Sequence, residues 1–357
     1  MTSEPTWPAL LNALAAGQDL SIADAEWAMG RVMTGEATPA QLGALLIALK
    51  IKGETVDEVV GFRDAALAHA TALDVPSAVL DIVGTGGDPV GVLNISSAAA
   101  VIAAAAGVPV VKHGNRAASS RSGASDVLTE LGIDVGISPE RTAEVLAEVG
   151  VTFANAATLH PGFRHAGPTR SEIGISTLFN VLGPLANPAR PEASAVGVAD
   201  LARVPLIVGV FQTRGATALV YRGDDGIDKL TTTGHSHVWE VTAGSVQEHD
   251  LDPAELGIPR ASLDEIAGAD PVHNAAVIRG VLAGEPGAAR DIVLLNAAAG
   301  LVAYDLWRHP EDRFVPLRER LAGALAVAER VVDSGLAGEK LDAWVAATRG
   351  GASGSGR

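Results

Sequence analysis

The sequence predicts an α/β fold, in which a small all-helical N-terminal domain joins a larger domain with a mainly parallel central sheet flanked by helices. Residues 8–72 carry only helical patterns, whereas short β-rich runs alternate with helical segments from residue 79 onward. Strand, loop and helix following one another in this order are typical of parallel sheets covered on both faces.

We expect the small domain to span residues 1–73, with helices from about 171–187 joining it. The α/β domain should span residues 74–349. The Gly/Ser-rich stretch 350–357 should be a flexible tail.

In the first part, one helix is marked by leucines spaced i, i+3, i+4 and i+7, which share one face: Leu42, Leu45, Leu46 and Leu49. Thr38 followed by Pro39 predicts where this helix begins, because the pair supplies an N-cap and a proline at the first helical position. A second helix is expected over residues 55–73.

In the second part, apolar runs bounded by turn residues predict the strands, and longer amphipathic patterns predict the helices. Strands are expected at 79–83, 108–111, 193–199, 216–221 and 237–242. Helices are expected at 96–106, 124–131, 139–149, 203–213, 271–283, 288–304, 315–334 and 338–348.

Composition excludes several classes of partner. The 357 residues carry a net charge of −16, which repels nucleic acid and acidic lipid, so any anionic ligand must be held by a local basic pocket. The chain has no cysteine and hence no disulfide or thiolate metal site. The N-terminus lacks the pattern of a signal peptide, and the longest apolar run, 98–111, is too short to span a bilayer. We expect a cytoplasmic protein with no nucleic-acid or membrane partner.

Two loops that follow expected strands have the residue types of an anion site. Gly84-Thr85-Gly86-Gly87-Asp88 lets the backbone approach a phosphate closely, and the helix that begins near residues 94–97 adds its positive end. An aspartate here suits a sugar hydroxyl or Mg²⁺. The second loop, 112–123, contains Lys112, Arg116 and Arg121 and no acid. Because both loops follow strands of one sheet, they predict a shared crevice for a phosphorylated sugar.

Two further segments are candidates for binding. Residues 160–170 again hold no acid, and Arg170 is the best candidate there, since a guanidinium binds a carboxylate through two hydrogen bonds. A single histidine in this segment is interpreted as structural. For Asp224 and Asp225 we favour a polar turn over a Mg²⁺ site.

These segments together resemble the anthranilate phosphoribosyltransferase family of the tryptophan pathway. The resemblance rests on GTGGD at 84–88, NISS at 94–97, KHGNRAASS at 112–120, LFNVLGPLANPARP at 178–191, GDDGIDKLTTT at 223–233 and RDIVLLNAAAGL at 290–301. It covers nearly the whole chain, and KHGNR together with LGPLANP is specific.

The resemblance implies a homodimer formed through the helical domain, which transfers phosphoribose from 5-phosphoribosyl 1-diphosphate to the amine of anthranilate with Mg²⁺ as cofactor. By this resemblance, the donor would be held by Gly84, Gly87, Asp88, Asn94, Ser96, Ser97, Lys112, Asn115, Arg116, Ser119 and Ser120. Anthranilate would meet Gly84, His113, Asn115 and Arg170. The metal would be bound by Ser96 and Asp228.

Four positions depart from the family pattern. Val92 replaces a more usual Ser, Thr or Phe, and Lys229 replaces the Glu of an Asp-Glu metal pair. Asn155-Ala156-Ala157 stands where Phe-Ala-Pro is usual, and Leu159 replaces an aromatic residue. Two hypotheses follow: the Lys229 ammonium either stands in for a second Mg²⁺ or abolishes that site, and a smaller, more polar pocket at Asn155 suits another acceptor.

Three alternative functions stay open at this point. One is transfer to a different aromatic or heterocyclic acceptor, and another is a nucleoside phosphorylase of related fold. The third is a non-catalytic, nucleic-acid-binding relative. KHGNR with Arg170 favours the transferase over the phosphorylase, and the acidic net charge speaks against nucleic acid.

Overall fold

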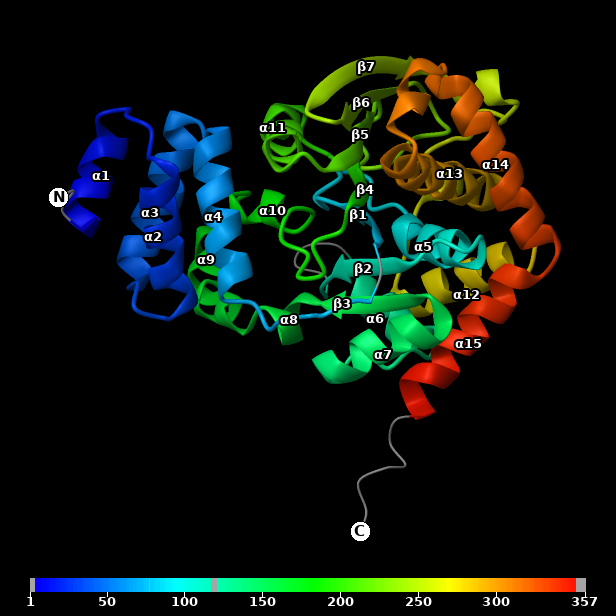
Figure 1. Ribbon diagram of the computed structural model, residues 1–357, viewed down its shortest axis with the longest axis horizontal. Coiled ribbons are helices and arrows are strands. Elements are labelled where there is room, and N and C mark those ends of the chain that lie inside the picture. The colour runs from blue at the N-terminus through cyan, green and yellow to red at the C-terminus, as the bar shows by residue number, and fades with distance from the viewer. Residues whose placement is uncertain (1–3, 77, 117–120, 351–357) are drawn as a thin grey trace, which may run out of the picture.

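The computed structural model describes residues 4–76, 78–116 and 121–350. Its N-terminal part is the expected helical bundle: α1 (Trp7–Ala15), α2 (Ile22–Met33), α3 (Pro39–Lys52) and α4 (Val56–Ala68). Figure 1 shows these helices on one side of the molecule. The predicted leucine face of α3 is fully buried. Thr38 caps that helix, and its exchange of hydrogen bonds with Gln41 completes a capping box.

The described strands of the larger domain form one seven-stranded sheet in the order β3-β2-β1-β4-β5-β6-β7. The strands are β1 (Leu80–Gly84), β2 (Val110–Gly114), β3 (Val151–Asn155), β4 (Ala193–Gly197), β5 (Thr217–Gly223), β6 (Ser236–Thr242) and β7 (Ser245–Leu251). Neighbours from β3 to β5 pair in parallel, and β6 and β7 are added antiparallel. The predicted α/β class with a mainly parallel sheet is confirmed.

Two edge strands are missing from the sequence prediction. β3 follows directly on Gly150, which ends the preceding helix, and it is only five residues long. No run of turn residues separates it from that helix. β7 reads SVQEHDL, and most of its side chains are exposed or half-buried, so it lacks the apolar run that marks a covered strand.

The helices of the larger domain cover both faces of the sheet (Figure 1). They are α5 (Ile95–Ala105), α6 (Ala124–Glu130), α7 (Pro139–Val149), α11 (Val204–Arg214), α12 (Pro271–Leu282), α13 (Ala288–Arg308), α14 (Leu317–Asp333) and α15 (Leu336–Gly350). The chain between β3 and β4 adds the short helices α8 (Ala156–Leu159), α9 (Gly167–Ile173) and α10 (Phe179–Leu182), of which α9 contacts α3 and α10 contacts α4. Short 3₁₀ turns lie at Pro161–His165, Leu201–Arg203, Pro253–Leu256, Asp264–Ile266 and Pro310–Phe314.

Alternate residues of the sheet contribute to two different cores. In β5, Leu219 and Tyr221 belong to the apolar cluster that contains residues of α5, α13 and α14. Ala218 and Val220 belong to a second cluster, with residues of α11 and of the N-terminal helices. The period of two is that of a strand covered on both faces. The helical bundle therefore shares one apolar core with α11 and one face of the sheet.

The segment 171–187 contains less helix than its pattern indicates. It holds the end of α9 and the four-residue α10, with turns around them. Phe179 and Leu182 are buried in the same cluster as Leu45 and Phe62 of the N-terminal helices.

The parallel strands end together at one edge of the sheet. Gly84 of β1 is in register with Gly197 of β4, and Gly114 of β2 with Asn155 of β3. The loops that leave this edge include both predicted anion-binding loops, which places them side by side. Among the described residues, no helix combines the length and apolar character needed to cross a bilayer.

Candidate functional site

Two glycines shape the centre of the site. A Cβ on Gly84 would lie 2.1 Å from Oδ2 of Asp228, and a Cβ on Gly197 would lie 1.7 Å from the Asp228 carbonyl oxygen. The second contact is with backbone, so β4 must end in glycine to let the segment after β5 cross it, while at Gly84 the Asp228 carboxylate occupies the space that a side chain would take. This crossing brings Asp228 and Lys229 against the first glycine-rich loop.

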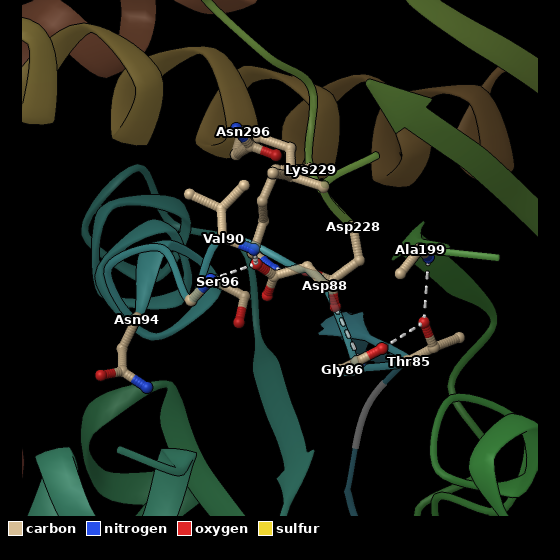
Figure 2. Close-up of polar contacts among 12 residues, drawn as sticks. Thr85, Gly86, Asp88, Val90, Asn94, Ser96, Ala199, Asp228, Lys229 and Asn296 are labelled. Atoms are coloured by element: carbon tan, nitrogen blue, oxygen red, sulfur yellow. Dashed lines mark hydrogen bonds and ion pairs between the residues drawn. The ribbon is translucent and has the colours of Figure 1, made fainter. Parts of the chain in front are cut away.

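The loop after β1 is held in shape by its own polar groups (Figure 2). Gly86 N–H donates to Asp228 Oδ2 at 2.8 Å, and the Thr85 hydroxyl accepts from Ala199 N–H at 3.1 Å. Asp88 Oδ1 accepts from the backbone N–H of Val90 at 3.0 Å and of Gly91 at 2.6 Å. Gly86, Gly87 and Gly91 all have positive φ, which glycine alone adopts easily. The Asp88 carboxylate, expected to face a ligand, therefore also fixes the turn.

The start of α5 contributes Asn94 and Ser96. The Asn94 side chain does not cap the helix. Instead, its Oδ1 accepts from the Ser122 hydroxyl and from Asn274 Nδ2, both at 2.9 Å, and its Nδ2 donates to the Ser122 carbonyl at 3.1 Å. Asn94 thus connects the start of α5 with the second predicted loop and with α12. Ser97 lies in the first turn of α5, and its buried hydroxyl has no partner in the described part of the chain.

Lys112 is a buried cation at the centre of the predicted donor site. Its side chain is on β2 and is 2% exposed, and its ammonium donates to the Ile82 carbonyl at 2.8 Å and to the Ser96 hydroxyl at 3.2 Å. Burial lowers the Lys112 pKa to about 8; the charge of Asp81 opposes this shift and that of Lys229 adds to it. The group is still mostly protonated at neutral pH.

Asp81 is a buried acid on the neighbouring strand β1 whose charge interacts with that of Lys112. It was not singled out from the sequence. Its Oδ1 accepts from His113 N–H at 3.1 Å, and its Oδ2 accepts from the Asn187 amide at 3.0 Å. The same Asn187 amide donates to the Val111 carbonyl at 2.9 Å. Burial raises the Asp81 pKa to about 6, although the charge of Lys112 opposes the shift. The available signal was an aspartate in the middle of the apolar strand VLDIV.

The histidines near the predicted acceptor side are neutral. His113 Nδ1 donates to the Gly183 carbonyl at 2.7 Å, and burial, followed by the influence of His160, lowers the His113 pKa to about 3. Its buried Nε2 has no partner among the described residues. His160 Nε2 donates to the Ala186 carbonyl at 2.7 Å, and burial lowers its pKa as well.

Arg170 on α9 carries the charge on this side. Its guanidinium carbon lies 4.8 Å from the centre of the Phe179 ring, and burial lowers its pKa. No carboxylate of the described residues forms an ion pair with it at 4.0 Å or less. A partly buried guanidinium stacked on an aromatic ring suits an aromatic carboxylate.

At two of the positions that depart from the family pattern, Asn155 and Leu159, the side chains make contacts within the protein. The Asn155 amide donates to the Val135 carbonyl at 3.0 Å and accepts from Ala157 N–H at 3.1 Å. Leu159 is 1% exposed and lies in an apolar cluster with Val111. The hypothesis of a more polar acceptor pocket depends on an amide whose oxygen and nitrogen both have protein partners.

The segment 223–233 forms the expected polar turn at Asp225. Its Oδ2 accepts from the hydroxyls of Thr231 and Thr233, both at 2.6 Å. Asp224 lies 3.5 Å from His237 at the surface. No group of three His, Cys, Asp or Glu suited to a metal occurs within the residues that the structure describes.

Most of the predicted donor residues come together at the ends of β1 and β2 and at the start of α5. The Asn115 side chain accepts from Arg116 N–H at 2.7 Å, directly after β2. Ser119 and Ser120 lie outside the described residues. Asp81, Asn187 and Asn274 are the polar residues at this site that sequence reasoning did not single out.

A helical bundle beside a parallel sheet, with anion-type loops at the sheet's carboxyl edge, defines the class of protein. Residues 8–70 match the helical bundle domain of the glycosyl transferase family, and residues 76–338 match the a/b domain of that family.

Individual relatives narrow this class. The chain is 69% identical to the anthranilate phosphoribosyltransferase of Clavibacter michiganensis subsp. michiganensis, an alignment that covers 98% of this chain and 100% of the relative. The crystal structure of the Thermus thermophilus enzyme of that name is 39% identical, with a TM-score of 0.87, and the match covers 95% of this chain and 99% of that one. The Saccharomyces cerevisiae enzyme in complex with PRPP and Mg is 25% identical, also with a TM-score of 0.87, over 98% and 99% of the two chains. The chain therefore belongs to the anthranilate phosphoribosyltransferase family, as its motifs predict.

Proposed function

We propose that this chain transfers phosphoribose from 5-phosphoribosyl 1-diphosphate to the amine of anthranilate, releasing diphosphate, as a step of tryptophan biosynthesis. The observation that carries the proposal is the buried Lys112 ammonium, which joins β1 at Ile82 to the start of α5 in a strongly acidic protein. Arg170, which has no carboxylate partner within the described chain, supplies a positive charge for binding the carboxylate of the acceptor substrate. The family membership supports both assignments.

On the donor side, the enzyme's task is to stabilise the charge of departing diphosphate. Backbone N–H groups at the end of the loop 84–88, after Gly86, and the N-terminal end of α5 supply the positive dipoles that we propose face the anion. Lys112 adds a fixed charge in a place with little water, where each interaction is stronger than in solution. Asn94, Asn115 and Arg116 complete the proposed donor set, together with Ser119 and Ser120 by the family pattern.

On the acceptor side, binding and orientation are the main requirements. We assign Arg170 to the anthranilate carboxylate through a two-bond contact, with His113 beside it as a neutral ring. An aromatic amine is neutral at pH 7, so no strong base is needed before attack on C1 of the ribose. Holding the amine in line with C1 then provides much of the rate.

Magnesium fits this site in one place. The Ser96 hydroxyl at the start of α5 accepts from Lys112, and together with diphosphate oxygens it would offer the oxygen ligands that Mg²⁺ prefers. When bound, the ion neutralises developing charge on the leaving diphosphate. Asp228 fits less well, because Lys229 pairs with one of its oxygens and Gly86 N–H with the other.

The remaining expectations stand as proposals. They are the division at residues 73 and 74, a homodimer formed through the helical bundle, and a cytoplasmic location. Phe179 and Leu182, which share an apolar core with the N-terminal helices, support treating 171–187 with the small domain.

Loss of anthranilate fluorescence in the presence of 5-phosphoribosyl 1-diphosphate and Mg²⁺ tests the function. Lys112→Met should lower kcat/KM by about 10²–10³-fold, while Lys50→Met, at an exposed lysine of α3, should leave it unchanged. Absence of donor binding by calorimetry would overturn the proposal. Donor binding without turnover would instead favour transfer to another aromatic acceptor.

A further inference from the structure

Lys229 and Asp228 form an ion pair at the donor site that the chemistry above does not use. The Lys229 ammonium contacts Asp228 Oδ1, and both residues are buried, at 7% and 2% exposure. Burying two charges is costly unless they are paired and their remaining hydrogen-bonding capacity is used. The second oxygen of Asp228 is used by Gly86 N–H, so the pair is attached directly to the glycine-rich loop.

The ammonium has hydrogen-bonding capacity left. An ammonium carries three N–H donors, and Asp228 is the single hydrogen-bond acceptor of Lys229 Nζ within the described residues. Its Nζ lies 3.2 Å from the place that a Cβ on Gly84 would take. Figure 2 shows Lys229 gathered with Asp88, Ser96 and Asp228 around one region. Two N–H groups of a buried cation are therefore available beside the loop proposed to hold diphosphate.

The fully buried charges at the donor site balance one another, and the half-buried Asp88 of the loop adds one negative charge. Four buried charged groups interact here: Asp81 and Asp228 are negative, and Lys112 and Lys229 are positive. Lys229 cancels the charge of Asp228, whose unpaired carboxylate would otherwise face the departing diphosphate. Exchange of Lys229 for Glu changes the formal charge from +1 to −1, a difference equal to the charge of one divalent cation.

We propose, on the basis of the proposed transferase function, that Lys229 is a built-in cation of the donor site. Its ammonium contacts a diphosphate oxygen of the donor and removes the need for a second divalent cation there. Asp228 then holds Lys229 and the loop in place and is not a metal ligand. The magnesium that accompanies the donor stays on the side of Ser96.

Counting bound metal ions tests this inference independently of activity. With the full chain, 5-phosphoribosyl 1-diphosphate and no acceptor, Mn²⁺ binding can be followed by the electron paramagnetic resonance of the free ion. We expect about one Mn²⁺ per chain for the wild type and for Lys229→Arg, and about two for Lys229→Glu, because two adjacent buried carboxylates attract a hard cation. Lys50→Glu makes the same charge change at an exposed site and should keep the wild-type count.

Donor affinity gives a second measurement if Lys229→Glu is poorly folded. Lys229→Gln should weaken donor binding by about tenfold at saturating Mg²⁺ through loss of a charge-assisted contact. The inference about Lys229 would be overturned, and the proposed function would stand, if the wild type and a folded Lys229→Glu bound equal numbers of ions. Unchanged donor affinity in Lys229→Gln would have the same meaning. A wild type that binds no donor would overturn the proposed function as well, so the two failures are distinguishable.

Discussion

The Asn187 amide donates to the carboxylate of Asp81 at 3.0 Å, across 106 positions of sequence. Through this contact and its bond to the Val111 carbonyl, Asn187 fastens the segment before β4 to β1 and to β2, the strand that carries Lys112 and His113. The asparagine of the LANP motif is therefore structural, because it donates a hydrogen bond to the buried Asp81.

Removal of this amide should affect both stability and donor binding. Asn187→Ala leaves a buried carboxylate oxygen and a carbonyl without their donor, which should lower the free energy of unfolding by about 2–3 kcal/mol. Donor affinity should also fall, because Asp81 helps to position the backbone of His113. Urea unfolding and calorimetry measure the two effects. Asn12→Ala, at an exposed position of α1, should change stability by less than about 0.5 kcal/mol.

Asn274 should matter for donor binding through Asn94. Asn274→Ala removes the bond to Asn94 Oδ1, and we expect donor affinity to fall by about tenfold while the KM for anthranilate changes little. Calorimetry with the donor and steady-state kinetics with the acceptor separate the two. A variant that loses stability but keeps its donor affinity would show that Asn274 has a purely structural role.

Arg170 should determine acceptor affinity. Arg170→Gln removes the guanidinium, and the KM for anthranilate should rise by about 10–100-fold, the value of a charge-assisted contact, while donor affinity is unchanged. Arg164→Gln is the matched control, because Arg164 comes from the same segment but is exposed. An equal effect of the two substitutions would contradict the assignment.

His113 should make the fold sensitive to acid. Its folded pKa, about 3, lies below the ordinary value of 6.5, so the unfolded chain binds a proton between these values that the folded chain does not. Stability is unaffected above pH 6.5 and falls as the pH decreases below it, by about 2 kcal/mol at pH 5. In His113→Asn this part of the pH dependence should disappear. Urea unfolding of both proteins at pH 7.5 and pH 5 gives the comparison.

Much of the fold could be predicted because strong patterns mark its buried parts. The α3 leucines and the apolar strands β1, β2, β4, β5 and β6 overlap elements that the sequence predicts, although β2 runs to Gly114 and so includes Lys112 and His113, which were expected in the loop after it. β3 and β7 could not be found, because one is short and joins a helix directly and the other is a polar edge strand. The helical content of 171–187 was overestimated, since its apolar spacing serves packing in a turn-rich segment.

The site was predictable as far as its residues lie close together in sequence. Lys112, Asn94 and Ser96 were found because short motifs carry them. Asp81 and Asn274 were not, because their partners lie 32 and 180 positions away and no local pattern records such contacts. Asp88 was expected to face a ligand, and its bonds to Val90 and Gly91 show how a loop acid can also serve the loop itself.

The paired glycines at the ends of β1 and β4 have a consequence for how this chain can vary. Gly84 and Gly197 open the path of Asp228 only while the two strands stay in register. Deletion of one residue from either strand would put a side chain in that path. Changes of length in these two strands, more than a hundred positions apart, must therefore occur together or be absorbed in the loops before them.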